Sequence, residues 1–179
     1  MKIMKISDPD IETAARKTAS HIKHYLLTKG PSHDDPLEVA RKAAEQALQN
    51  VGEVPFFLFV TTQADKQAGV VLSIDADAET YADDRDRLIR AILLLVNAKS
   101  YAIASEMWTS AKNMQPSQDP EREEGVMVTA VDAMHARVAM ARIKRDAEGK
   151  PSLEAWESWD EHAVPILTSL LPEVQTGHA

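Results

Sequence analysis

The stretch that decides the fold spans residues 54 to 145, where the apolar helical run LIRAILLLV (88–96) lies between segments typical of strands. Short turns join the first two and the last two of these segments, which predicts antiparallel hairpins. The strand-like segments are PFFLFVTT (55–62), GVVLSID (69–75), YAIASEMWT (101–109), GVMVTAV (125–131) and ARVAMARI (136–143).

Two helices are expected before this stretch. The sequence SDPD (7–10) offers a capping side chain, a first-turn proline and early acids, and Asp35-Pro36 repeats that signal. Gly52 suits the position just after the second helix. Each helix shows one apolar stripe at helical spacing. The stripes are Ile11, Ala15, Thr18, Ile22 and Leu26 in the first helix, and Leu37, Ala40, Ala44, Ala47, Leu48 and Val51 in the second.

The order of elements predicts one α+β domain over residues 1–179. A last helix is expected in the apolar run 163–171, which gives the order ααββαβββα. We expect two layers, a mostly antiparallel five-stranded sheet with helices packed on one face. The segment 56–60 is apolar on both sides of its pleat, which favours a central strand or one covered on both faces. By element order the chain is similar to profilin-like, roadblock and GAF-type domains, and this resemblance implies a module for dimerisation or small-ligand binding.

Two polar segments fall outside this pattern. Residues 110–124 (SAKNMQPSQDPEREE) predict a long polar loop, and loops of this length are often functional. Residues 173–179 predict a flexible tail.

Composition restricts the classes of function. The chain has 179 residues, a formal net charge of -8 and no cysteine, so it has no disulfide and no thiolate site, and a reducing cytoplasm is the expected location. The acidic balance argues against nucleic acid as a partner. We expect no membrane insertion, because the longest apolar run is short, and no secretory signal begins the chain.

One strand is basic, with Arg137, Arg142, Lys144 and Arg145, whereas residues 147–179 hold six acids and one lysine. We expect these cations to pair with acids of this tail, in the same or a neighbouring chain, rather than to bind nucleic acid.

The sequence lacks the motifs of common enzymes and metal sites. It has no GxSxG, no glycine-rich phosphate loop and no HExxH. His21 and His24 have no recognisable third ligand, so we expect no metal or cofactor. Five acids match the spacing of a calcium loop, but the glycine and the final glutamate of that loop are missing, and a solvated loop is the expected structure. These acids are Asp75, Asp77, Glu79, Asp83 and Asp86.

Glu106 is the most unusual polar residue, because it shares a strand face with Ala102, Ala104 and Trp108. A buried carboxylate would need a cation or donors, and Arg122, Arg137 or Arg142 are the candidate partners. Glu106, Trp108 and Arg122 are therefore the candidate ligand or partner surface, with Trp108 as a stacking wall and Arg122 as an anion anchor. For Glu106 itself we favour a structural ion pair at the strand edge over a functional site, because perturbed carboxylates are often structural.

Two functions remain open. The absence of catalytic motifs predicts a cytoplasmic, non-enzymatic binding or assembly module that acts on a protein partner or forms a homodimer. Trp156 and Trp159, three residues apart, are expected to anchor the tail or to mark an interface. The alternative is a small hydrolase or transferase with a polar site around Glu106 and Arg122, joined by His135, whose pairing with Asp132 otherwise suits a hairpin turn.

Overall fold

The computed structural model describes residues 3–7, 11–75, 81–110, 120–161 and 170–171. Three helices and eight strands follow one another in this part of the chain. They are β1 (Ile3–Ser7), α1 (Ile11–Leu27), α2 (Pro36–Val51), β2 (Phe57–Thr62), β3 (Gln67–Asp75), α3 (Tyr81–Val96), β4 (Ala98–Thr109), β5 (Glu123–Val131), β6 (Ala136–Arg145), β7 (Pro151–Leu153) and β8 (Glu157–Glu161).

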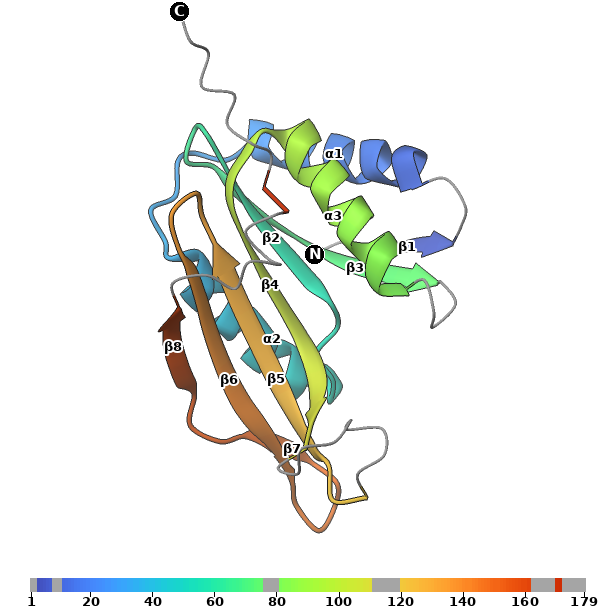
Figure 1. Ribbon diagram of the computed structural model, residues 1–179, viewed down its shortest axis with the longest axis vertical. Helices are drawn as coiled ribbons and strands as arrows, with labels where there is room; N and C mark the ends of the chain where they lie inside the picture. Colours follow the sequence, from blue (N-terminus) through green and yellow to red (C-terminus); the bar gives the residue numbers. More distant parts are fainter. Residues whose placement is uncertain (1–2, 8–10, 76–80, 111–119, 162–169, 172–179) are drawn as a thin grey trace, which may run out of the picture.

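The strands form a single sheet in the order β1-β3-β2-β4-β5-β6-β7 (Figure 1). β8 pairs with the first half of β6, on the same edge on which β7 pairs with its last residues. All pairs are antiparallel except the parallel pair β1–β3. The predicted α+β class and mostly antiparallel sheet are therefore confirmed. The predicted five strands are too few, because β1, β7 and β8 extend the sheet at its two sides.

Helices cover both faces of the sheet, which corrects the prediction that they pack on one face. Successive side chains of β2 point to opposite sides, so Leu58 joins the core under α1 and α3, and Phe57 joins the core under α2. Figure 1 shows α1 and α3 in front of one end of the sheet and α2 behind it. The physical reason lies in β2, which is apolar on both sides of its pleat and needs a cover on each.

The predicted signals around α2 are confirmed. The Asp35 carboxylate accepts a hydrogen bond of 3.1 Å from the Leu37 amide, and Pro36 opens the helix. Gly52 ends it in the left-handed conformation, with φ of 86°. Val51 departs from the predicted stripe, because 70% of it is exposed at the last helical position.

Gly69 of β3 is held against an aromatic ring. It pairs with Phe59 of β2, and a Cβ atom on Gly69 would lie 2.5 Å from Cε1 of that ring. We expect Gly69→Ala to lower the free energy of unfolding by about 1–2 kcal/mol, because the ring must leave its place. Urea unfolding in a Phe59→Ala background is the control, since no ring remains there to be displaced. Equal costs in the two backgrounds would show that the ring is irrelevant.

Several predicted segments differ from the structure or lie outside its described residues. β4 ends at Thr109 and β5 begins at Glu123, so the last two residues of the predicted 110–124 loop belong to a strand. Residues 111–119, most of the predicted C-terminal helix and the 173–179 tail lie outside the described residues. None of the described helices is long and apolar enough to cross a membrane.

Candidate functional site

Glu106 is an exposed residue of β4 whose carboxylate reaches the chain just after α2. Its Oε1 accepts a hydrogen bond of 2.7 Å from the backbone amide of Val54. The predicted arginine partners are therefore wrong for this residue. Arg137 pairs with Asp35, and Arg142 pairs with Glu123. The carboxylate ties the end of α2 to the sheet.

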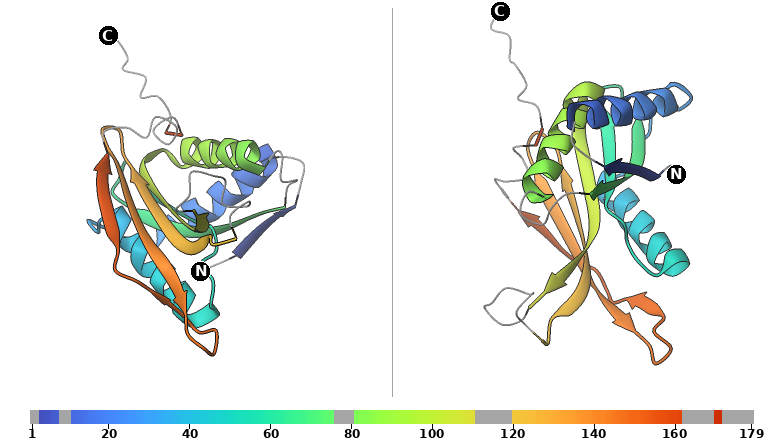
Figure 2. Two further views of the ribbon diagram at one scale, coloured as in Figure 1. Left: turned by 60° about the horizontal axis from the view of Figure 1, so that its bottom comes forward. Right: turned by 90° about the vertical axis from the view of Figure 1, so that its right-hand side faces the viewer.

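Trp108 and Arg122 form a stacked pair at the C-terminal end of β4. The Arg122 guanidinium lies 4.4 Å from the centroid of the Trp108 ring, and 45% of Trp108 is exposed. Trp108 follows Glu106 by two positions on the same strand, so their side chains leave the same face. The far ends of β4 and β5 project past the helices (Figure 2). We call Glu106, Trp108 and Arg122 the Trp108 surface.

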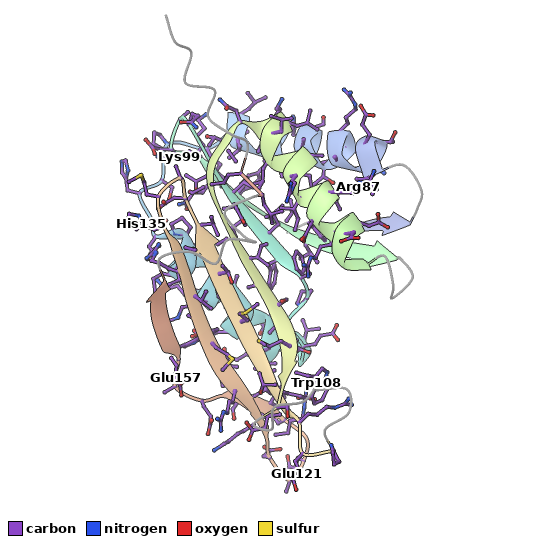
Figure 3. All side chains as sticks on the ribbon, viewed as in Figure 1. Arg87, Lys99, Trp108, Glu121, His135 and Glu157 are labelled. Atoms are coloured by element: carbon purple, nitrogen blue, oxygen red, sulfur yellow. The ribbon has the colours of Figure 1, made fainter. Side chains whose placement is uncertain are left out.

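His135 does not belong to this group. It lies in the hairpin turn after β5, whereas Arg122 precedes β5, so the length of that strand separates them. Figure 3 shows His135 and Glu121, the residue before Arg122, at opposite ends of the sheet. The Asp132 carboxylate accepts backbone hydrogen bonds of 2.8 Å from Met134 and from His135. This geometry explains Asp132 as the residue that closes the turn, as the hairpin prediction expected.

The basic strand β6 pairs with acids of the same chain. These acids come mostly from neighbouring strands and from the start of α2 rather than from the predicted tail, to which Glu154 alone of the four belongs. The pairs are Arg137–Asp35, Arg142–Glu123, Lys144–Glu154 and Arg145–Glu124. In-chain pairing thus accounts for the basic residues of β6.

Metal ligation gains no support from the described residues. Among them, no three acidic or histidine side chains lie close enough to hold an ion. His21 Nδ1 lies 2.8 Å from the Lys17 carbonyl oxygen, so this ring is engaged along its own helix. Residues 76–80 of the calcium-like acidic segment, which include Asp77 and Glu79, lie outside the described part of the chain.

Trp156 anchors the connection between β7 and β8 to α2. Its Nε1 donates a hydrogen bond of 2.7 Å to Glu45 Oε1, and the Arg41 guanidinium lies 5.0 Å from the ring centroid. Trp159 lies three positions further along, in β8 opposite Val138. The anchoring role predicted for the tryptophans is thus seen for Trp156.

We expect Trp156→Phe to lower the free energy of unfolding by about 1 kcal/mol, since the ring stays and its bond to the Glu45 carboxylate is lost. A double-mutant cycle with Glu45→Ala measures this bond by urea unfolding. Non-additivity of about 1 kcal/mol is the expected result. Fully additive costs would mean that the hydrogen bond contributes nothing.

A cavity of about 740 Å³ lies between α1 and the beginning of β3. Sequence spacing does not predict it, because its walls come from α1, the connection to α2, α2, β2 and β3. They include Tyr25 of α1, Ser32 and Asp34 of the connection to α2, Val39 of α2, and Phe59 and Gly69 of the sheet. One signal was present, since a glycine inside a strand marks a bulge or the close approach of another group.

No protein-family model matches this chain, and no curated protein or solved structure matches it either.

Proposed function

We propose that this chain is a cytoplasmic, non-enzymatic binding or assembly module that holds a protein partner, or a second copy of itself, at the Trp108 surface. The observation that carries this proposal is Trp108, an indole 45% exposed and stacked by Arg122 at the projecting end of the sheet.

Tryptophan and arginine are the residues that most often dominate the energy of protein interfaces. The stack holds both side chains in one arrangement before any partner arrives, which lowers the entropy lost on binding. The Val54 amide fixes the Glu106 carboxylate nearby in the same way. A partner would thus meet an aromatic plane with one cation and one anion beside it.

The hydrolase or transferase alternative has no comparable support. It needs Glu106, Arg122 and His135 around one substrate, but His135 follows β5 and Arg122 precedes it, so they lie at opposite ends of that strand. No ion pair joins Glu106 to Arg122 among the described side chains. The Glu106 carboxylate instead holds a backbone amide.

The test combines light scattering over a wide concentration range with quantitative affinity capture from cell extract, for the parent and for Trp108→Ala. We expect the parent to dimerise or to enrich a defined set of proteins. The variant is expected to weaken this association by about tenfold or more, as a central interface tryptophan would.

Leu94→Ala is the control, because Leu94 is a 65% exposed residue of α3 and not of the Trp108 surface. It should behave as the parent does. A parent that stays monomeric at every concentration, with a captured set that Trp108→Ala does not change, would overturn the proposal.

A further inference from the structure

Among the described residues, only half of the outer edge of β3 is paired. β1 pairs with the second half of β3, from Val71 to Asp75. In the described part of the chain, no strand pairs with the first half, from Gln67 to Val70, on that side. An unpaired strand edge presents backbone donors and acceptors to any extended chain that reaches it.

The hydrogen bonds between β2 and β3 show which residues face this open edge. The Leu72 amide donates to the Phe56 carbonyl at 2.9 Å, and the Thr62 amide donates to the Lys66 carbonyl at 3.0 Å. Along a strand, the backbone N–H and C=O groups of successive residues point alternately to the two sides. The even-numbered residues of β3 therefore bond to β2. Gln67 and Gly69 therefore direct their backbone groups to the outer edge, and Gly69 has no side chain to obstruct an approaching backbone.

The cavity of about 740 Å³ lies along this same half of β3. Apolar side chains line it on both sides of the sheet, among polar ones. Ile22 and Tyr25 of α1 line one side, and Phe59 and Val39 line the other. Figure 2 shows α1 and α2 on opposite sides of this edge.

The connection between α1 and α2 closes one end of the cavity. The Gln67 side chain donates a hydrogen bond of 2.6 Å to the Asp34 carbonyl, and the Ser32 amide donates one of 2.7 Å to the Asp65 carbonyl. We call the space bounded by α1, this connection and residues 67–70 the β3-edge groove. Four residues of strand are about 13 Å long, which sets the length of chain that fits.

We propose that the β3-edge groove binds an extended peptide segment of a partner protein, which pairs its backbone with Gln67 and Gly69 and continues the sheet in line with β1. This mode of recognition takes affinity from main-chain hydrogen bonds and specificity from alternate side chains. The open half of β3 has four residues, so the segment is about four residues long. Because apolar side chains line the groove on both sides of the sheet, the segment is apolar on both sides of its pleat.

Continuity with β1 favours a peptide over a small molecule. β1 already pairs in parallel with the next residues of β3, beginning at Ile3 opposite Val71, so the groove continues an edge that this fold uses for strand pairing.

The ionisable lining of the groove includes Lys29 and Asp34, of opposite charge, together with histidines. No strong preference for an acidic or a basic segment follows. This site is independent of the Trp108 surface, which lies on other strands.

The probe is a fluorescent library of N-acetylated, C-amidated hexapeptides with varied apolar residues, tested by polarisation against the full chain. The tightest peptide is then methylated at one backbone amide at a time. We expect methylation to weaken binding by about tenfold or more at alternate amides only, because every second amide faces β3.

Tyr25→Ala is expected to weaken the same peptide by about tenfold, as loss of an aromatic wall would. Trp108→Ala, a matched exposed aromatic outside the groove, should leave binding unchanged. Circular dichroism checks that both variants fold, and the methylation scan on the parent decides the question should Tyr25→Ala fail to fold.

Three results would overturn this proposal. One is that no peptide in the library binds more tightly than about 1 mM. The second is equal tolerance of methylation at every amide, which would indicate a side-chain pocket for a small molecule. The third is equal weakening by Tyr25→Ala and Trp108→Ala, which would place the peptide elsewhere.

Discussion

Replacing Phe57 with alanine is expected to lower the free energy of unfolding by about 3–5 kcal/mol, and replacing its neighbour Leu58 by about 2–5 kcal/mol. Phe57 is 1% exposed and Leu58 is 0% exposed, although they point to opposite faces of β2. Each truncation leaves a cavity in a different core, one under α2 and one under α1 and α3. Urea unfolding of each single variant measures both costs.

The control is Leu94→Ala, which removes the same atoms as Leu58→Ala from a side chain that is 65% exposed. Its cost should stay within about 0.5 kcal/mol, as for most surface substitutions. A sheet with one solvated face would give a large cost for only one residue of the pair Phe57 and Leu58. That outcome would contradict the two-sided arrangement.

The apolar pattern of β2 predicts a cover on both faces of the sheet, whereas the predicted placement of all helices on one face was wrong. Residues 56–60 are apolar on both sides, and this pattern predicts a strand covered on both faces. The one-face arrangement followed from element order, which does not fix the side on which α2 lies. The choice depends on long-range packing of its small stripe, such as Ala40 and Ala44, against β4 and β5.

The strands that were missed lack the usual signal. β7 has three residues and β8 has the sequence ESWDE, so neither shows an apolar alternation long enough to predict. β1 directly precedes the capping residues 7–10, which predict a helix start, and its few residues give no separate strand signal. Their pairing partners, β6 and β3, determine these strands through tertiary contacts that local propensity does not record.

The candidate site was predictable in part. An unusual carboxylate at Glu106 needs donors, and the structure supplies one, but the donor is the Val54 amide 52 residues earlier in the chain. The Arg122 guanidinium stacks on the Trp108 ring, and the predicted stacking of a ligand or partner on Trp108 stays a prediction. Such pairings depend on how strand ends meet, which sequence spacing alone does not give.

Replacing Asp35 with alanine is expected to lower the free energy of unfolding by about 2 kcal/mol, because this carboxylate has two tasks. It caps α2 through the Leu37 amide, and it accepts hydrogen bonds from Arg137 of β6, one of 2.8 Å from Nη1 to Oδ2. This value allows for solvent screening, since the side chains of Asp35 and Arg137 are 37% and 36% exposed. Asp35→Asn keeps a capping oxygen and loses the charge, so about half of this cost is expected.

The contribution of Asp35 should depend on pH. Hydrogen bonds from Arg137 hold the pKa of the Asp35 carboxyl below its ordinary value. Partial burial raises this pKa, and the hydrogen bond from the Leu37 amide lowers it further. As the pH falls, the unfolded chain therefore takes up this proton first. The stabilisation is fully present above the unfolded pKa and is lost as the pH falls through the folded pKa.

Urea unfolding of the parent and of Asp35→Asn at neutral pH and in acid tests this expectation. The difference between them should be largest at neutral pH and should shrink in acid, where the parent loses its charge as well. Glu12→Gln is the control, because the Glu12–Arg16 pair lies on the surface, with side chains 71% and 66% exposed, and its removal should change stability little at either pH. A difference that stays constant with pH would show that Asp35 acts on the fold as a neutral cap, and that its charge on Arg137 contributes nothing.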